Sequence, residues 1–126
     1  MIAIDTSSWI AFFEDAAGAD VELVERVLGD RHACIPPVVL AELLSDPKLP
    51  ANVEEVLGRL PVLDVLDGYW ARAGALRAKL IRAKRRAPLA DTLIAQSCVD
   101  HDVPLVTRDA DFRRVARASG LRLLLS

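Results

Sequence analysis

The sequence predicts an α/β fold in which helices cover both faces of a mostly parallel sheet. Two features predict it: short apolar runs that are typical of buried strands, and longer segments with helical spacing that alternate with them. The apolar runs are residues 1–4, 33–35, 104–107 and 121–125. Because 126 residues with 52% hydrophobic side chains can bury a core without disulfide bonds or a structural metal, we expect a single domain spanning residues 1–126.

The N-terminal stretch combines a strand, a carboxylate and a helix. Asp5 follows the first apolar run directly, and a cluster of hydroxyl residues, 6–8, precedes a second apolar run, 9–13, that indicates a helix. Ser7 or Ser8 can cap this helix. In open α/β sheets ligands bind beyond the carboxyl ends of strands, so Asp5 is either a turn residue or part of a site.

Three helices are expected next. The first covers residues 20–28, with Asp20 as its possible cap, and the second runs through 36–44, since Pro is tolerated in a first helical turn. Glu42 lies on or beside the apolar face of this second helix, with no Lys or Arg within one turn. Its carboxylate therefore needs a metal, a distant cation or a proton. Residues 51–60 indicate a further short helix.

A longer helix is expected from Leu66 onward, with apolar residues recurring along one face. If this helix continues far enough, four basic residues share the adjacent stripe: Arg72, Lys79, Arg82 and Arg86. Most charged stripes are solvated helix faces. The alternative is a patch that contacts phosphates, which is favoured if the helix ends near a carboxylate site.

Two further acids stand out in the last third of the chain. Asp91 lies in the first turn of an apolar helix expected over residues 89–99, where the helix dipole stabilises a carboxylate and where a capping role is also possible. Asp109 follows the third strand, as Asp5 follows the first. A helix over residues 113–118 and the last apolar run complete the alternation.

The bulk composition excludes several classes of protein. The net charge of −2 argues against broad, charge-driven nucleic-acid binding, though not against a local basic patch. Cys34 and Cys98 lie among apolar neighbours with no metal-binding spacing, so we expect buried thiols in a reducing cytoplasm. No apolar stretch is long enough to span a membrane, and no signal peptide is expected.

The four acids indicate a metal site only when they are considered together. Asp5 and Asp109 follow strand ends, whereas Glu42 and Asp91 lie on apolar helix faces or starts. Burying several carboxylates close together is costly unless a cation holds them. Oxygen ligands without His or Cys favour Mg²⁺ or Mn²⁺, and such a site can activate water for displacement at phosphorus.

These segments resemble the PIN-domain ribonucleases, specifically the VapC toxins of VapBC toxin–antitoxin pairs. The resemblance extends over nearly the whole chain and implies a PIN-like α/β fold. Four motifs in this order carry it: Ile4-Asp5-Thr6-Ser7, Val39-Leu40-Ala41-Glu42-Leu43, Ala90-Asp91-Thr92-Leu93-Ile94-Ala95, and Leu105-Val106-Thr107-Arg108-Asp109-Ala110-Asp111-Phe112. One departure is Gln96, where the family usually has Ala; it lies off the face of Asp91.

The resemblance implies a Mg²⁺-dependent endoribonuclease, with Mn²⁺ as a possible substitute. Asp5 and Asp91 would hold the principal ion, Glu42 would complete its shell directly or through water, and Asp109 would hold a second ion or orient the attacking water. Asp111 is the alternative fourth acid. A hydroxyl near the metal corresponds to Thr6 or Ser7, and the basic stripe would contact RNA phosphates.

The resemblance also implies partners: a homodimer, and a VapB-type antitoxin whose C-terminal segment fills the cleft and often brings an Arg to the acids. Other classes fit less well. A receiver-type phospho-acceptor domain needs an acidic pair after the first strand and a Lys after a late one, and an aspartate-nucleophile phosphatase needs an acid where Ser7 stands. A PIN nuclease that is not a toxin, or a PIN fold used only for binding, are the alternatives within the family.

Overall fold

The computed structural model describes residues 1–125 and contains a parallel four-stranded sheet in the order β2-β1-β3-β4. The strands are β1 (Ile2–Ile4), β2 (Ala33–Cys34), β3 (Leu105–Val106) and β4 (Leu123–Leu124). Ala3 pairs with Cys34 on one side and with Leu105 on the other, so β1 lies inside the sheet. The α/β fold with a parallel sheet is therefore confirmed.

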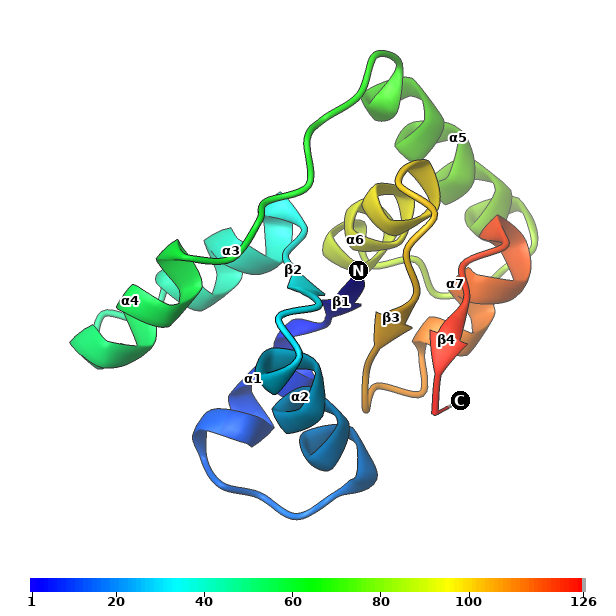
Figure 1. Cartoon of the computed structure of the whole chain (residues 1–126). Coiled ribbons are helices and arrows are strands. Elements are labelled where there is room, and N and C mark those ends of the chain that lie inside the picture. Colours follow the sequence, from blue (N-terminus) through cyan, green and yellow to red (C-terminus); the bar gives the residue numbers. More distant parts are fainter. Residues whose placement is uncertain (126) are drawn as a thin grey trace.

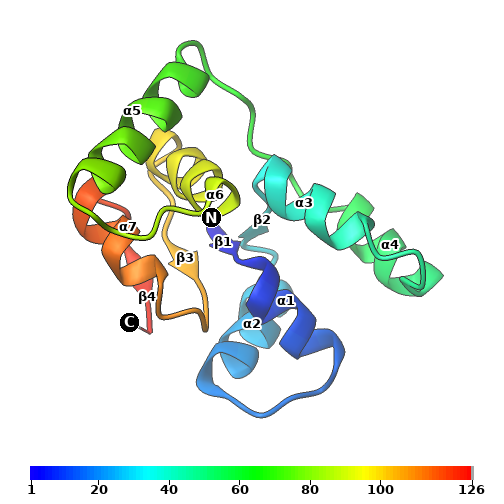
Figure 2. The same cartoon turned by 180° about the vertical axis from the view of Figure 1, so that it is seen from behind.

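Seven helices are found among residues 1–125, and they form separate groups around the sheet. They are α1 (Thr6–Phe13), α2 (Ala19–Gly29), α3 (Pro37–Leu44), α4 (Ala51–Gly58), α5 (Tyr69–Arg82), α6 (Leu89–Asp100) and α7 (Phe112–Ser119). Figure 1 shows α5, α6 and α7 gathered on one side of the sheet, and α1 with α2 on another. The view from behind shows the same grouping, with α3 and α4 forming an arm (Figure 2).

The core lies where the sheet meets these helices. Trp9 of α1 and Phe112 of α7 are the largest fully buried side chains, and Ile4, Ile94 and Leu105 are buried with them. Both thiols are buried as expected, and burial raises the pKa of each. No helix within residues 1–125 combines the length and the apolar character needed to cross a membrane.

The structure corrects both expected caps in the N-terminal part. Helix α1 begins at Thr6 with Asp5 in the cap position, so Ser7 and Ser8 lie inside the helix rather than before it. Helix α2 has Gly18 in the cap position, and Asp20 is the buried second residue of the helix. Ser7 donates to the nearby Asp5 instead, whereas Ser8 and Asp20 bond each other across 12 positions, which sequence spacing cannot reveal.

The structure also shortens α5 at both ends relative to the expectation. Gly68 has a φ of 82°, which is left-handed, so the helix begins at Tyr69 rather than at Leu66. It ends at Arg82, and Lys84 has a φ of 56° in the turn that follows. Arg86 therefore does not continue the basic stripe along the helix.

Candidate active site

Asp5 lies at the carboxyl end of β1 and is held in place from both sides. Its backbone N–H donates to the Val106 carbonyl at 2.8 Å, and its side chain is buried. One carboxylate oxygen, Oδ2, accepts hydrogen bonds from the Ser7 hydroxyl at 2.7 Å and from the Thr107 hydroxyl at 2.8 Å. The adjacent parallel strands β1 and β3 thus bring Thr107 to the first acid of the chain.

Glu42 approaches this site from α3. Its Oε1 accepts a hydrogen bond of 2.8 Å from the hydroxyl of Thr6, the residue after Asp5. Glu42 is expected on or beside an apolar face, and the structure shows it exposed beside the buried Leu43. Its exposure leaves the carboxylate accessible to a ligand.

Asp91 lies in the first turn of α6, half-buried, and the other acids affect its titration. Its pKa is raised from 3.8 to about 6, first by burial and then by the negative charges of other acids, in decreasing order Asp5, Asp109, Glu42 and Asp111. No side-chain capping bond is found at this helix start within the described residues. The other predicted acids therefore lie close enough to Asp91 to affect its titration.

Asp109 and Asp111 lie in the turn between β3 and α7. The backbone N–H of Asp109 donates to the Thr107 hydroxyl at 3.0 Å, and its Oδ1 accepts the N–H of Asp111 at 2.9 Å. Asp111 is approached by Arg86 at 3.7 Å and by Arg114 at 3.8 Å. Burial and Asp5 raise the pKa of Asp91 most, and Asp109 and Asp111 both add to the rise. Asp109 as the fourth acid, with Asp111 as the alternative, stays a prediction.

The donor set fits a hard divalent cation. All the converging groups are carboxylates or hydroxyls, the ligands that Mg²⁺ and Mn²⁺ prefer, and their mutual repulsion is what such a cation relieves. Within residues 1–125, however, no three acidic, His or Cys side chains lie close enough to form a ready-made metal cluster.

The basic residues that sequence reasoning selected fall into two groups. Arg72 forms a forked ion pair with Asp100, at 3.0 and 2.7 Å, and Lys79 donates to the Ala118 carbonyl at 2.8 Å. Both therefore have partners within the chain. Arg82 is exposed at the end of α5, and Arg86 is exposed within reach of Asp111. Of the four basic residues, Arg86 is the one with a contact to an acid of the predicted site within residues 1–125.

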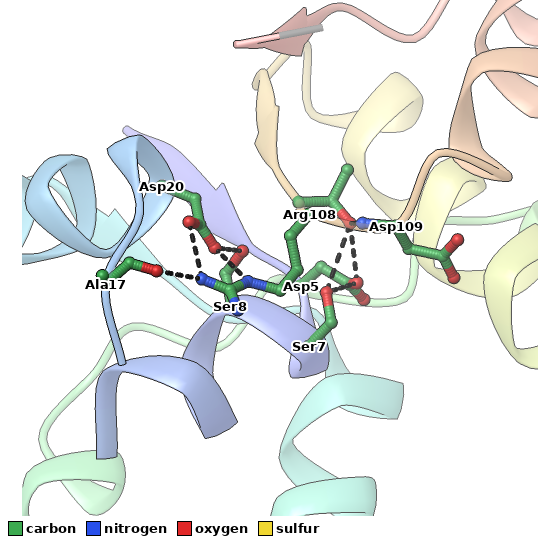
Figure 3. A network of polar contacts seen from close by, with 8 residues as sticks. Asp5, Ser7, Ser8, Ala17, Asp20, Arg108 and Asp109 are labelled. Carbon is green, nitrogen blue, oxygen red and sulfur yellow. Dashed lines mark hydrogen bonds and ion pairs between the residues drawn. The ribbon is translucent and has the colours of Figure 1, made fainter. Parts of the chain in front are cut away.

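Sequence reasoning missed two contributors to the site. Thr107 was only part of a motif, yet it bonds both the Asp5 carboxylate and the Asp109 backbone. Arg108, next to it, reaches Asp20 of α2 (Figure 3). The position of Thr107 at a strand end was a usable signal. The partnership of Arg108 with a residue 88 positions away was not.

Comparison with known proteins agrees with this geometry. The family model described as "PIN domain" matches residues 2–118. VapC ribonuclease Mb1587 of Mycobacterium bovis and ribonuclease VapC11 of Mycobacterium tuberculosis are each 35% identical over 133 residues, covering 97% of this chain and 96% of the relative. The chain belongs to the PIN-domain family, among the VapC ribonucleases. PIN-domain VapC nucleases are metal-dependent.

Solved structures share the fold at lower identity. VapBC2 from Rickettsia felis, bound to a DNA fragment from its promoter, has a TM-score of 0.72 at 22% identity, covering 98% of both chains. DNA-bound VapBC from Salmonella typhimurium has a TM-score of 0.72 at 24% identity and the same coverage. Family membership removes the receiver and phosphatase alternatives.

Proposed function

We propose that this protein is the toxin of a type II toxin–antitoxin pair, an endoribonuclease that uses Mg²⁺, with Mn²⁺ as a substitute. The observation that carries the metal assignment is the convergence of negative charge on Asp91, whose pKa is raised first by burial and then by the charges of four other acids. Asp5 and Asp91 would hold the principal ion, and Glu42 and Asp109 would complete its shell or orient water. The relatives' names support ribonuclease activity.

Hydroxyl side chains of the chain hold the carboxylates that would bind the metal. A bound Mg²⁺ supplies an activated water and neutralises charge on the phosphate. Ser7 and Thr107 fix one oxygen of Asp5, which leaves its other oxygen for a ligand. The Thr6 hydroxyl similarly fixes Oε1 of Glu42. Attack of water on phosphorus with loss of the 3′ oxygen leaves a 5′-phosphate and a 3′-hydroxyl on the two products.

The central experiment is cleavage of single-stranded RNA by the purified protein in Mg²⁺, in Mn²⁺ and in EDTA. Asp5→Asn and Asp91→Asn are each expected to lower the cleavage rate by at least about 100-fold, as loss of a metal ligand does. Asp64→Asn, which removes an exposed acid outside the site, is the control and should cleave at the wild-type rate. Full activity of Asp5→Asn, or cleavage in EDTA, would contradict the assignment.

RNA would approach along the basic side of the site. Ten of the sixteen Lys and Arg residues lie between positions 79 and 122, against five of the eighteen acids. Arg82 and Arg86 belong to this segment, as do Arg113 and Arg117 of α7, which line a shared hollow. These side chains would neutralise phosphates and position the strand rather than read its sequence. Arg72 and Lys79, which already have partners, would contribute less.

A VapB-type antitoxin is the partner we propose, because the similar structures are VapBC assemblies. An apolar groove of about 270 Å³ between α1, α3 and α4 fits an inserted segment, and Glu42 stands at its edge beside Leu43. Ile10→Glu, at an exposed position in the groove, should weaken binding of the antitoxin encoded beside this chain, measured by calorimetry. Undiminished binding would place the antitoxin elsewhere.

We also propose that the protein forms a homodimer, which light scattering of the purified protein would test.

A further inference from the structure

A second polar network lies beside the acids and contains none of them. Asp20, at the start of α2, accepts hydrogen bonds from Arg108 Nε at 2.8 Å and from Arg108 Nη2 at 2.9 Å. The same Nη2 donates to the Ala17 carbonyl at 3.1 Å, and the buried Ser8 hydroxyl donates to Asp20 at 2.8 Å. Asp20 is only 7% exposed, and Figure 3 shows Arg108 extended toward it. This network joins α1, α2 and the turn after β3.

The network is built from chain neighbours of the residues that hold Asp5. Two adjacent pairs each send one side chain to Asp5 and the next to Asp20: Ser7 and Ser8 in α1, Thr107 and Arg108 after β3. Each of the two carboxylates therefore accepts hydrogen bonds from one side chain of α1 and from one side chain of the turn after β3. Moving either segment would disturb both carboxylates together.

Arg108 also lies between Thr107 and Asp109, the two residues of this turn that belong to the candidate site. Thr107 donates to Asp5, and the N–H of Asp109 donates back to the Thr107 hydroxyl. The forked bond to Asp20 holds the guanidinium against α2 and so ties the segment between these two neighbours to that helix. In Figure 3 the Asp109 carboxylate points away from Asp20, which places the acid and the fork on opposite sides of the chain.

Gly18 provides the room for this fork. Its φ is 150°, and a Cβ added there would lie 2.5 Å from Asp20 Oδ1 and 2.8 Å from Arg108 Nη2. Any other residue would push into both partners. The loop between α1 and α2 therefore needs glycine at this position to accommodate the contact between Asp20 and Arg108.

We propose that Asp20 and Arg108 form a positioning pair that holds the segment 107–109, and through it sets the carboxylates of Asp5 and Asp109 for metal binding. The pair acts from outside the acid cluster and touches neither metal nor substrate. The role of the pair in metal binding rests on the proposed function, whereas its role in holding the segment 107–109 does not. The very low pKa of Asp20, about 2, which is due mainly to its bond with Arg108, agrees with a tight contact.

The chain offers a closely matched control for testing this pair. Asp100 accepts a fork from Arg72 at 3.0 and 2.7 Å and a neutral donor, Gln96, at 2.8 Å, as Asp20 accepts Arg108 and Ser8. The side chain of Asp100 is 6% exposed and that of Asp20 is 9% exposed. Asp100 is the last residue of α6, whereas Asp91 lies in the first turn of this helix. Asp20→Asn and Asp100→Asn therefore remove equivalent charges near and far from the site.

Two measurements are made on both variants. Amide hydrogen exchange at Asp109, in protein without metal, reports whether its N–H still bonds Thr107; Asp20→Asn should speed it at least about 10-fold. Mg²⁺ affinity by calorimetry should fall about 10- to 100-fold, the usual effect of losing a group that orients a ligand. Asp100→Asn should leave both within about 2-fold of wild type. Arg108→Lys, which keeps charge but not the fork, should show smaller changes in the same direction.

Equal exchange at Asp109 in Asp20→Asn and in Asp100→Asn would overturn the proposal, whatever the protein does to RNA. Should Asp20→Asn not fold, Arg108→Lys decides the question by the same comparison. If exchange accelerates as expected while the wild type neither binds Mg²⁺ nor cleaves RNA, the positioning pair stands and the proposed function fails. Wild-type kcat with an unchanged KM in Asp20→Asn would also count against the pair.

Discussion

Replacing Asp91 by Asn should stabilise the protein when no metal is present. The Asp91 carboxyl titrates near 6 in the folded chain, against 3.8 for the free side chain, because it is half-buried and faces other acids. Above pH 6 the folded state therefore carries a charge that its surroundings disfavour. Asn has nearly the same shape and carries no charge, so the variant removes this cost.

The size of the effect follows from the two pKa values. A rise from 3.8 to about 6 corresponds to at most about 3 kcal/mol, at 1.36 kcal/mol for each pH unit. Solvent screening of a half-exposed group reduces this figure, and so does the favourable helix dipole at the start of α6. We expect a net gain of about 1 kcal/mol at pH 7.5, or a rise in Tm of about 3–6 °C.

The pH dependence has a definite sign. Because the folded pKa of Asp91 is raised, the folded state binds more protons than the unfolded state between pH 3.8 and about 6. The contribution of Asp91 to stability therefore worsens as pH rises through this window and is constant above it. The advantage of Asp91→Asn should be absent below pH 4 and complete above pH 6.5.

Thermal and urea unfolding in EDTA between pH 3.5 and 8 measure this difference, with Asp64→Asn as an exposed control that should show no gain. Adding 10 mM Mg²⁺ should raise the Tm of the wild type but not that of Asp91→Asn, since a ligand that binds only the folded state stabilises it. A lower Tm for Asp91→Asn at pH 7.5 without metal would refute the reasoning. Asp91 would then act chiefly through the helix dipole.

Three other results are expected. Thr107→Val, which is nearly isosteric and removes one donor to Asp5 and the acceptor of the Asp109 N–H, should lower cleavage by about 10-fold; a wild-type rate on the same RNA would show that the Asp5 bonds are dispensable. Arg82→Glu with Arg86→Glu should weaken RNA binding and flatten its dependence on salt, measured by fluorescence anisotropy, and an unchanged slope would return both residues to a solvated surface. Cys34 and Cys98 should resist alkylation in the native protein at pH 8, because burial raises both pKa values; rapid labelling by mass spectrometry would contradict their burial.

The order of the elements could be predicted from the sequence alone, and the sequence also supplied the four candidate acids. Apolar runs at periods typical of strands and helices mark each element, because burial of one face is a local requirement that each segment meets with its own residues. Asp5 and Asp109 follow strand ends that the parallel sheet brings to one edge. For that reason a topological argument, together with the family resemblance, could name them as candidate site residues, and their role stays a prediction.

Only the tertiary structure decided the partners of the polar side chains. Ser8 and Asp20 resemble helix caps in the sequence, but they bond each other, and Asp20 pairs with Arg108 instead of capping α2. The stripe through Arg86 ends early because the backbone turns after Arg82. Hydrogen bonds and ion pairs form between whichever groups the fold brings within about 3 Å, so distant partners leave no periodic signal in the sequence.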